Sequence, residues 1–177
     1  MRKVAAEVGV AATAIYWHVG GRDDLLSAVL DSMIADLPQP IPRGRTPRER
    51  VASLARAMRE QALATTHTQQ LARHLGRSAE LFLPGQVALA CELSAAGLRG
   101  EDAAQAVRAV LFLVGGFVLL EDNYRTAQPG SGRIQDLWTA VDDPGIDGDL
   151  RRAMSRATTP DTLFGYTVDR LLASILP

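Results

Sequence analysis

Residues 2–26 read RKVAAEVGVAATAIYWHVGGRDDLL, and this stretch decides the N-terminal fold. Its first apolar residues recur at the spacing of one helix face: Val4, Ala5 and Val8. Gly9 follows at a position where helices commonly end in the left-handed conformation. Apolar residues resume in 11–19, where Ile15 and Val19 would anchor a second short helix. Two short helices joined by a tight glycine turn predict a helix-turn-helix.

The outward residues of this stretch suit a DNA groove. Hydroxyl, phenol, imidazole and small side chains can contact phosphates and base edges. Arg22, at the start of a third helix, would help to bind a phosphate. The alternative is that Tyr16 and Trp17 are core aromatics of an ordinary helical domain, but the co-occurrence of VAAEVGV, IYWHV and RDDLL favours DNA. The predicted DNA-binding residues are Arg2, Ala12, Thr13, Tyr16, Trp17, His18 and Arg22.

The same stretch resembles the DNA-binding domain of the TetR family of bacterial repressors, and YWHV is similar to the tetracycline repressors. The matching positions are Val4, Ala5, Gly9, Val10, Ile15, Tyr16, His18, Val19, Arg22 and Leu25. The resemblance implies a homodimeric transcriptional repressor that binds double-stranded operator DNA and releases it on binding a small molecule. Two departures are Ala11, which replaces a serine N-cap worth about 1 kcal/mol, and Arg22, which replaces a lysine.

The first helix of the family's DNA-binding domain has no counterpart here, since Met1 falls where an internal methionine would lie. Without that helix, an exposed apolar patch is expected at Val4, Val8, Ile15 and Leu25. A wrongly chosen start codon or a truncation is the favoured explanation. The third explanation is a protein that has lost firm DNA binding, and the alternative function is then a helical ligand-binding homodimer.

Composition fits a small regulator. The chain has 177 residues and is 47% hydrophobic, which excludes disorder and allows one core of ordinary size. The longest apolar run, residues 109–120, is shorter than a membrane span, so no membrane partner is expected. One cysteine and no apolar signal segment predict a cytoplasmic protein. The net charge of −1 is neutral evidence on nucleic acid.

The rest of the chain shows helical patterns and no strand pattern, so the predicted fold class is all-α. We expect an N-terminally incomplete helix-turn-helix DNA-binding domain at 1–36, a proline-rich linker at 37–45, and a helical-bundle domain for ligand binding and dimerisation at 46–177. Thr46 and Pro47 predict the N-cap and first turn of the bundle's first helix. The nearby arginines are expected on a solvated face: Arg43, Arg45, Arg48, Arg50, Arg56 and Arg59.

Residues 74–122 and 164–175 resemble the regulatory domain of tetracycline-repressor-type proteins. His74 matches a histidine that coordinates ligand-bound magnesium there, but it has no cluster of ligands nearby, so no metal or cofactor is expected. Cys91 is expected to be buried and inert. Apolar candidates predict a largely apolar effector, with core packing as the alternative role. The candidate ligand-binding residues are Met58, His74, Leu75, Val87, Cys91, Val110, Val114 and Phe117.

Two helices are expected to form the dimer interface. The first, at about 103–124, is apolar all round between residues 109 and 120, so a second subunit would cover one side. The second covers 160–176. Residues 128–148, rich in Pro, Gly and Asp, predict a long loop. The predicted dimerisation residues are Leu111, Gly115, Leu119, Phe164, Val168, Leu171, Leu172 and Ile175.

Enzymes are the competing class. The three histidines, at positions 18, 67 and 74, are not part of a recognisable catalytic motif. The sequence also lacks the motifs of serine hydrolases, zinc proteases, P-loop proteins and dinucleotide-binding proteins. We therefore expect a protein that is not an enzyme.

Overall fold

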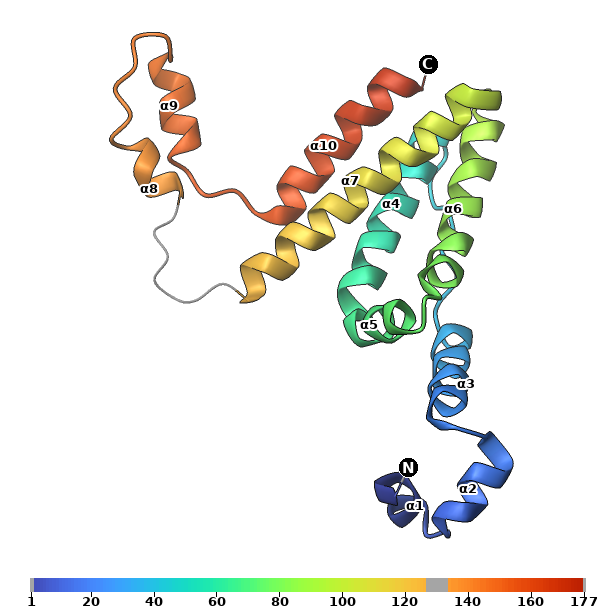
Figure 1. The fold of residues 1–177 in the computed structure, drawn as a ribbon. Coiled ribbons are helices and arrows are strands. Elements are labelled where there is room, and N and C mark those ends of the chain that lie inside the picture. The colour runs from blue at the N-terminus through green and yellow to red at the C-terminus, as the bar shows by residue number, and fades with distance from the viewer. Residues whose placement is uncertain (1, 127–133, 177) are drawn as a thin grey trace.

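A computed structural model describes residues 2–126 and 134–176, and the regular structure in these ranges is entirely helical (Figure 1). This confirms the all-α fold class. The helices are α1 (Arg2–Val8), α2 (Ala12–Val19), α3 (Arg22–Ala35), α4 (Pro47–Ala64), α5 (Thr66–His74), α6 (Ser78–Ala95), α7 (Gly100–Thr126), α8 (Ile134–Trp138), α9 (Gly148–Met154) and α10 (Pro160–Ile175).

The first three helices follow the sequence pattern closely. Gly9 ends α1 with a φ of 72°, in the left-handed region that favours glycine. Ala11 precedes α2 in an extended conformation and provides no side-chain cap, as its replacement of serine predicts. α3 begins at Arg22, where the Asp24 carboxylate accepts a hydrogen bond from the Gly21 N–H at 2.7 Å. The chain then runs without helix through residues 36–46.

The start of α4 confirms the predicted cap. The Thr46 hydroxyl accepts a hydrogen bond from the Glu49 N–H at 3.2 Å, and the Glu49 carboxylate accepts one from the Thr46 N–H at 3.0 Å. The Arg45 N–H donates to the same carboxylate at 2.6 Å. These backbone hydrogen bonds, Thr46 first, hold the pKa of Glu49 below its ordinary value. Reciprocal bonds of this kind fix where a helix begins.

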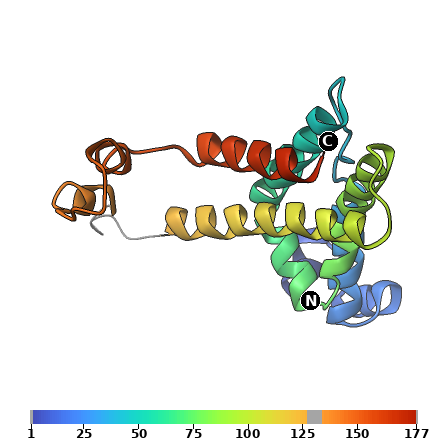
Figure 2. The same ribbon diagram turned by 90° about the horizontal axis from the view of Figure 1, so that it is seen from above.

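The core lies in a bundle of α4, α6, α7 and α10. α7 and α10 run antiparallel and side by side, while α4 and α6 pack on α7 (Figures 1 and 2). Fully burying one leucine or phenylalanine contributes about 1.5–3 kcal/mol, so this core dominates stability. Its largest fully buried side chains are Val51, Leu54, Leu89, Leu93, Phe164 and Leu172.

Arg59 corrects the prediction of a solvated arginine face on α4. Its side chain is buried and forms a two-bond ion pair with Glu121 of α7, at 2.7 and 2.8 Å. It also pairs with Asp161 at 2.7 Å and lies 4.8 Å from the ring centre of Phe164 on α10. Arg50 likewise pairs with Glu92 of α6 at 2.6 Å. Periodicity alone could not show that these arginines meet carboxylates on neighbouring helices.

α7 is slightly longer than expected, and, as its apolar pattern predicts for a single subunit, one of its sides is uncovered. Its stretch Gly100–Glu121 has the length and apolar composition of a membrane span, with a mean hydropathy of 2.0 over its most apolar window, which corrects the expectation that no segment does. One side of the helix supplies Ala106, Val110 and Val114 to the bundle core. The opposite side is exposed. We call it the outer face of α7; it consists of Arg108, Phe112, Gly116 and Leu120.

α8 and α9 lie apart from the bundle, beyond the ends of α7 and α10, in both views (Figures 1 and 2). The sequence predicts a loop at 128–148, but residues 134–138 of that stretch form helix α8. Residues 128–133 of the predicted loop lie outside the described residues. α9 is capped by Asp147, whose carboxylate accepts hydrogen bonds from the N–H groups of Asp149 and Leu150 at 2.7 and 3.0 Å.

Candidate functional site

Helix α2 presents the predicted contact residues to solvent. Thr13, Tyr16, Trp17 and His18 are all exposed, and the Trp17 side chain is 90% accessible. Ile15, on the opposite side of α2, is buried. A core role for the two aromatics does not fit this exposure, because large apolar surface at a single helix usually marks a contact site. The side chain of Ala12 lies outside what the structure describes.

The turn between α2 and α3 requires glycine and positions Arg22. Gly20 has a φ of 84°, and a Cβ at this residue would lie 2.5 Å from the Asp24 carboxylate. The tight turn brings Arg22 to the exposed first turn of α3, directly after α2. Arg2 is exposed on α1. Arg2 and Arg22 are thus exposed cations that a phosphate could contact, although Asp23 and Asp24 follow Arg22 directly in the first turn of α3.

The apolar patch expected on the first two helices is present only in part. Val4 and Val8 are exposed, at 40% and 66%, and Val10 is exposed beside them. Ile15 is buried and Leu25 half-buried, which corrects that part of the expectation. Ile15 is lost from the patch because α1 packs against α2.

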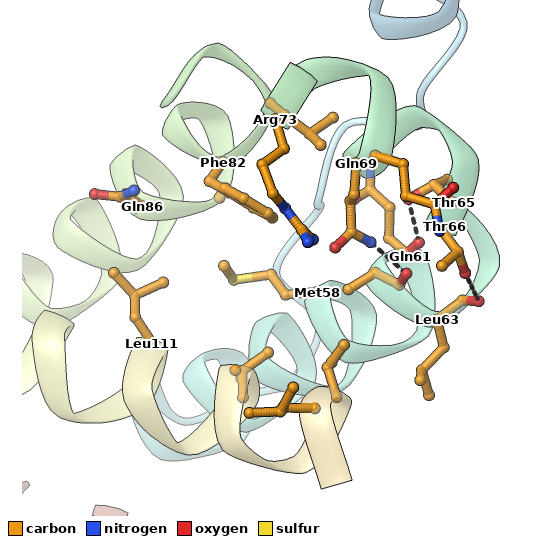
Figure 3. A pocket seen from close by; sticks show the side chains of 18 residues that line it. Met58, Gln61, Leu63, Thr65, Thr66, Gln69, Arg73, Phe82, Gln86 and Leu111 are labelled. Carbon is orange, nitrogen blue, oxygen red and sulfur yellow. Dashed lines mark hydrogen bonds between the residues drawn. The ribbon is translucent and has the colours of Figure 1, made fainter. Parts of the chain in front are cut away.

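A cavity of about 480 Å³ lies between α4, α5, α6 and α7 (Figure 3). Its size is within the range of small-molecule sites in proteins. Apolar side chains come mainly from α4, α6 and α7, whereas α5 contributes polar side chains. The lining residues are Met58, Gln61, Ala62, Leu63, Thr65, Thr66, Gln69, Gln70, Arg73, Leu81, Phe82, Gly85, Gln86, Leu111, Val114, Gly115, Val118 and Leu119.

Two of the predicted ligand-binding residues, Met58 and Val114, line this cavity. The other six do not. Val110 is buried in the bundle core, and the Phe117 ring packs edge-on against Phe164 with centroids 5.1 Å apart. The Cys91 side chain is exposed, which corrects the expectation of a buried thiol. The remaining three lie outside the cavity: His74, Leu75 and Val87.

The predicted dimerisation residues fall into two groups, one that lines the cavity and one that packs in the bundle core. Leu111, Gly115 and Leu119 line the cavity, because residues four apart on α7 share the face that turns toward α4 and α5. Phe164, Val168 and Leu172 are buried inside the subunit, which corrects their placement at an interface. Leu171 and Ile175 are partly buried against the same core.

Sequence analysis missed the polar part of the cavity. Thr66, Gln69, Gln70 and Arg73 recur at intervals of three and four on α5, so they share one face, and this polar stripe is the signal that could have identified them. The Gln69 amide donates to the Ala62 carbonyl at 2.5 Å, which holds α5 against the end of α4. On α6, a Cβ at Gly85 would lie 2.7 Å from the Met58 methyl carbon. Glycine there allows α4 and α6 to approach at the edge of the cavity.

Helix α3 is attached to the helices that form the cavity. α3 packs against α5. Arg77, at the start of α6, binds Asp31 of α3 at 2.7 Å and Glu80 at 2.5 Å, and it donates to the Ser27 hydroxyl at 3.5 Å. The hydrogen bond to Glu80, and then the one to Asp31, raises the pKa of Arg77, and Arg77 lowers the pKa of Glu80. This contact joins the helix-turn-helix to the wall of the cavity.

Metal binding finds no support in the described residues. Within 2–126 and 134–176, no group of three or more His, Cys, Asp or Glu side chains could hold an ion. His74, at the end of α5, stands outside the cavity.

Comparison with known proteins gives similarity to transcriptional regulators. An HTH-type transcriptional regulator of Saccharopolyspora erythraea is 31% identical over 133 residues, which are 71% of this chain and 53% of that protein. The chain therefore spans about half the length of this curated relative. No family model matches the sequence.

Solved structures show the fold. The TetR-family protein ActR of Streptomyces coelicolor, in complex with actinorhodin, has a TM-score of 0.62 at 23% identity, covering 99% of this chain and 85% of ActR. Apo ActR of Streptomyces coelicolor has a TM-score of 0.66 at 21% identity, and the match covers 99% of this chain and 83% of ActR. TetR from Acinetobacter baumannii has a TM-score of 0.57 at 22% identity, covering 98% and 83%.

Proposed function

The chain has the fold of the TetR-family regulators, and from this premise we propose that it is a ligand-responsive transcriptional repressor acting as a homodimer in the cytoplasm. We assign it no catalytic role. One observation carries the proposal: α3, which follows the exposed helix α2, is held by Arg77 and by α5 to the wall of the cavity. A molecule bound in the cavity can therefore act on the position of α2.

We propose that α2 enters the major groove of operator DNA. Tyr16 and Trp17 are exposed on a short helix preceded by a tight turn, which is the geometry of a recognition helix. Arg22 would bind a backbone phosphate at the start of α3. The chain as a whole carries no excess of positive charge, so affinity would depend on local placement and on two copies acting together.

Release of DNA would be a shift between two populated conformations. A ligand moves such an equilibrium only by as much as it prefers one state over the other. α5 lines the cavity on one side and packs against α3 on the other, so a ligand that repositions α5 changes the angle of α3. Support for a ligand in this fold comes from ActR, which has been solved with actinorhodin.

The outer face of α7 is our candidate for the dimer interface. Phe112, in the middle of this long helix, is 81% exposed, and Leu120 is exposed two turns further on. Gly116 between them would allow a partner helix to approach closely. A long helix with an uncovered apolar face needs a partner surface, and a second copy provides one.

The test is selection of bound duplexes from a random pool, followed by gel retardation on the enriched sequence. We expect a two-fold symmetric site, with affinity that falls steeply as salt rises. Tyr16→Ala and Arg22→Ala should each weaken binding about tenfold or more, whereas Arg156→Ala, which removes an exposed arginine just after the end of α9, should not. Sedimentation should show dimers for all three variants.

Two results would contradict this proposal. If no duplex is enriched, the alternative of a ligand-binding homodimer without DNA affinity becomes the better function. If Tyr16→Ala or Arg22→Ala dissociates the dimer, the division into an N-terminal DNA module and a C-terminal dimerisation module is wrong. Phe112→Glu is the positive control, since it should yield monomers with much weaker DNA binding.

A further inference from the structure

The described residues that line the cavity carry a single positive charge and no negative one. Among the described residues that line it, Arg73 is the one charged side chain, and no carboxylate faces it. A guanidinium stays charged at every physiological pH. Arg73 is exposed to water, so the site depends on its charge and its donors and not on burial of the cation. The site is therefore electrostatically complementary to an anion.

The position of Arg73 fits this role. Its side chain points from α5 toward the cavity, which Phe82, Met58 and Gln69 also line (Figure 3). Within the described part of the chain, no hydrogen bond or ion pair engages this guanidinium. Arg77, one turn further along the chain, is by contrast fully engaged with Asp31 and Glu80. The planar donors of Arg73 are free to bind a carboxylate or sulfonate with two hydrogen bonds.

The wall facing Arg73 is apolar and would accommodate the rest of the ligand. Leu111, Val114 and Val118 of α7 and Met58 of α4 form it, and Phe82 adds an aromatic face. The amides of Gln61 and Gln86 also line the cavity and can bind a neutral oxygen. The lining thus matches a molecule that has one anionic end and a large apolar body.

We propose that the effector is an amphipathic organic anion whose carboxylate or sulfonate pairs with Arg73 and whose apolar, ring-containing body lies against α7. This inference rests on the proposed function, because it names the class of ligand that the regulatory cavity takes. It refines the expectation of a largely apolar effector by adding one negative charge at a defined place.

The test uses two fluorescent probes with the same ring skeleton. 8-Anilinonaphthalene-1-sulfonate carries the anion, and N-phenyl-1-naphthylamine is its neutral counterpart. In the full chain, Arg73→Gln should weaken binding of the sulfonate probe about ten- to a hundredfold, which is the range for a charged hydrogen bond. The same substitution should change the affinity for the neutral probe less than twofold. Arg56→Gln, which removes an exposed arginine of α4 outside the cavity, should change neither.

A second variant tests whether the probes occupy the cavity. Gly115 lines it, and a Cβ there meets no atom within 4 Å, so Gly115→Leu should fill the cavity without a clash. Both probes should then be excluded, while circular dichroism and sedimentation stay as in the unchanged protein. Sulfonate binding that survives this change would overturn the proposal.

The remaining outcomes separate the two proposals. If Arg73→Gln weakens both probes equally, or neither, the anion assignment is wrong even where the protein binds DNA. If the sulfonate probe depends on Arg73 but the random duplex pool yields no site, the ligand class stands and the repressor function fails.

Discussion

The helix-turn-helix region and the bundle bury their residues very differently. Among the residues whose side chains the structure describes, the bundle encloses thirteen in one core, with Leu54, Leu89, Leu93 and Leu172 completely inaccessible. The described apolar side chains that are buried in α1–α3 are those of Ala5, Ile15 and Leu30. The described residues that are exposed on α2 are polar and aromatic, whereas the buried bundle residues are mostly aliphatic. The proposed DNA contacts therefore lie on exposed side chains, whereas most of the stability comes from buried ones.

The largest expected effect comes from comparing two side-chain truncations, one in the bundle and one in the N-terminal helices. Leu54→Ala removes a fully buried side chain of the bundle and should lower the free energy of unfolding by about 2–5 kcal/mol. Val8→Ala, on α1, removes a side chain that is 66% exposed and should change it by about 0.5 kcal/mol or less. Urea denaturation followed by circular dichroism measures both. Equal effects would show that the N-terminal helices belong to the same cooperative core.

A smaller effect is expected at the contact that joins the two regions. Arg77→Gln breaks the pair with Asp31, so the midpoint of urea unfolding should decrease modestly at low salt, and the difference should shrink at 1 M salt. A double-mutant cycle with Asp31→Asn separates this pair from the bond between Arg77 and Glu80. If the cycle shows no coupling, the pair between Arg77 and Asp31 does not join the regions, and the packing of α3 on α5 and the contact of Arg77 with Ser27 remain.

The smallest expected effect is a change in how the stability of the fold depends on pH in the acid range. The pKa of Glu49 is lowered by backbone hydrogen bonds at the start of α4, and that of Glu80 by Arg77. A carboxylate with a lowered folded-state pKa stabilises the fold above its unfolded value, near 4.5, and loses this contribution as the pH falls through the lowered value. Glu49→Gln and Glu80→Gln should each flatten the decline in stability below pH 4.5. Unchanged pH profiles would show that neither contact persists in solution.

The local features of the fold could be predicted from the sequence because neighbouring residues encode them. Gly9 marks the end of α1, and Thr46 with Pro47 marks the start of α4, through contacts within a few residues of chain. The exposure of Tyr16 and Trp17 could be predicted from the co-occurrence of VAAEVGV, IYWHV and RDDLL, and not from the two aromatics alone. Features that depend on residues close together in the chain can be predicted from the sequence alone.

The cavity could not be predicted in the same way because it depends on which faces of distant helices meet. The sequence predicts Leu111 and Gly115 at a dimer interface but does not show that they also line a cavity, since an all-apolar helix does not indicate which of its sides faces its own subunit. Arg59 was placed in solvent because its carboxylate partner, Glu121, lies 62 positions further along the chain. The polar stripe of α5 was visible in the sequence, but its importance depends on the neighbouring helices.

The polar side chains of the cavity have a consequence for how this protein can evolve. Gln61, Gln86 and Arg73 are half-buried or exposed, and none of them belongs to the bundle core. Substitutions there would alter which molecule is recognised at little cost in folding, because no packed volume is lost. If the cavity binds the proposed effector, proteins with this fold can change their ligand while the bundle core changes slowly.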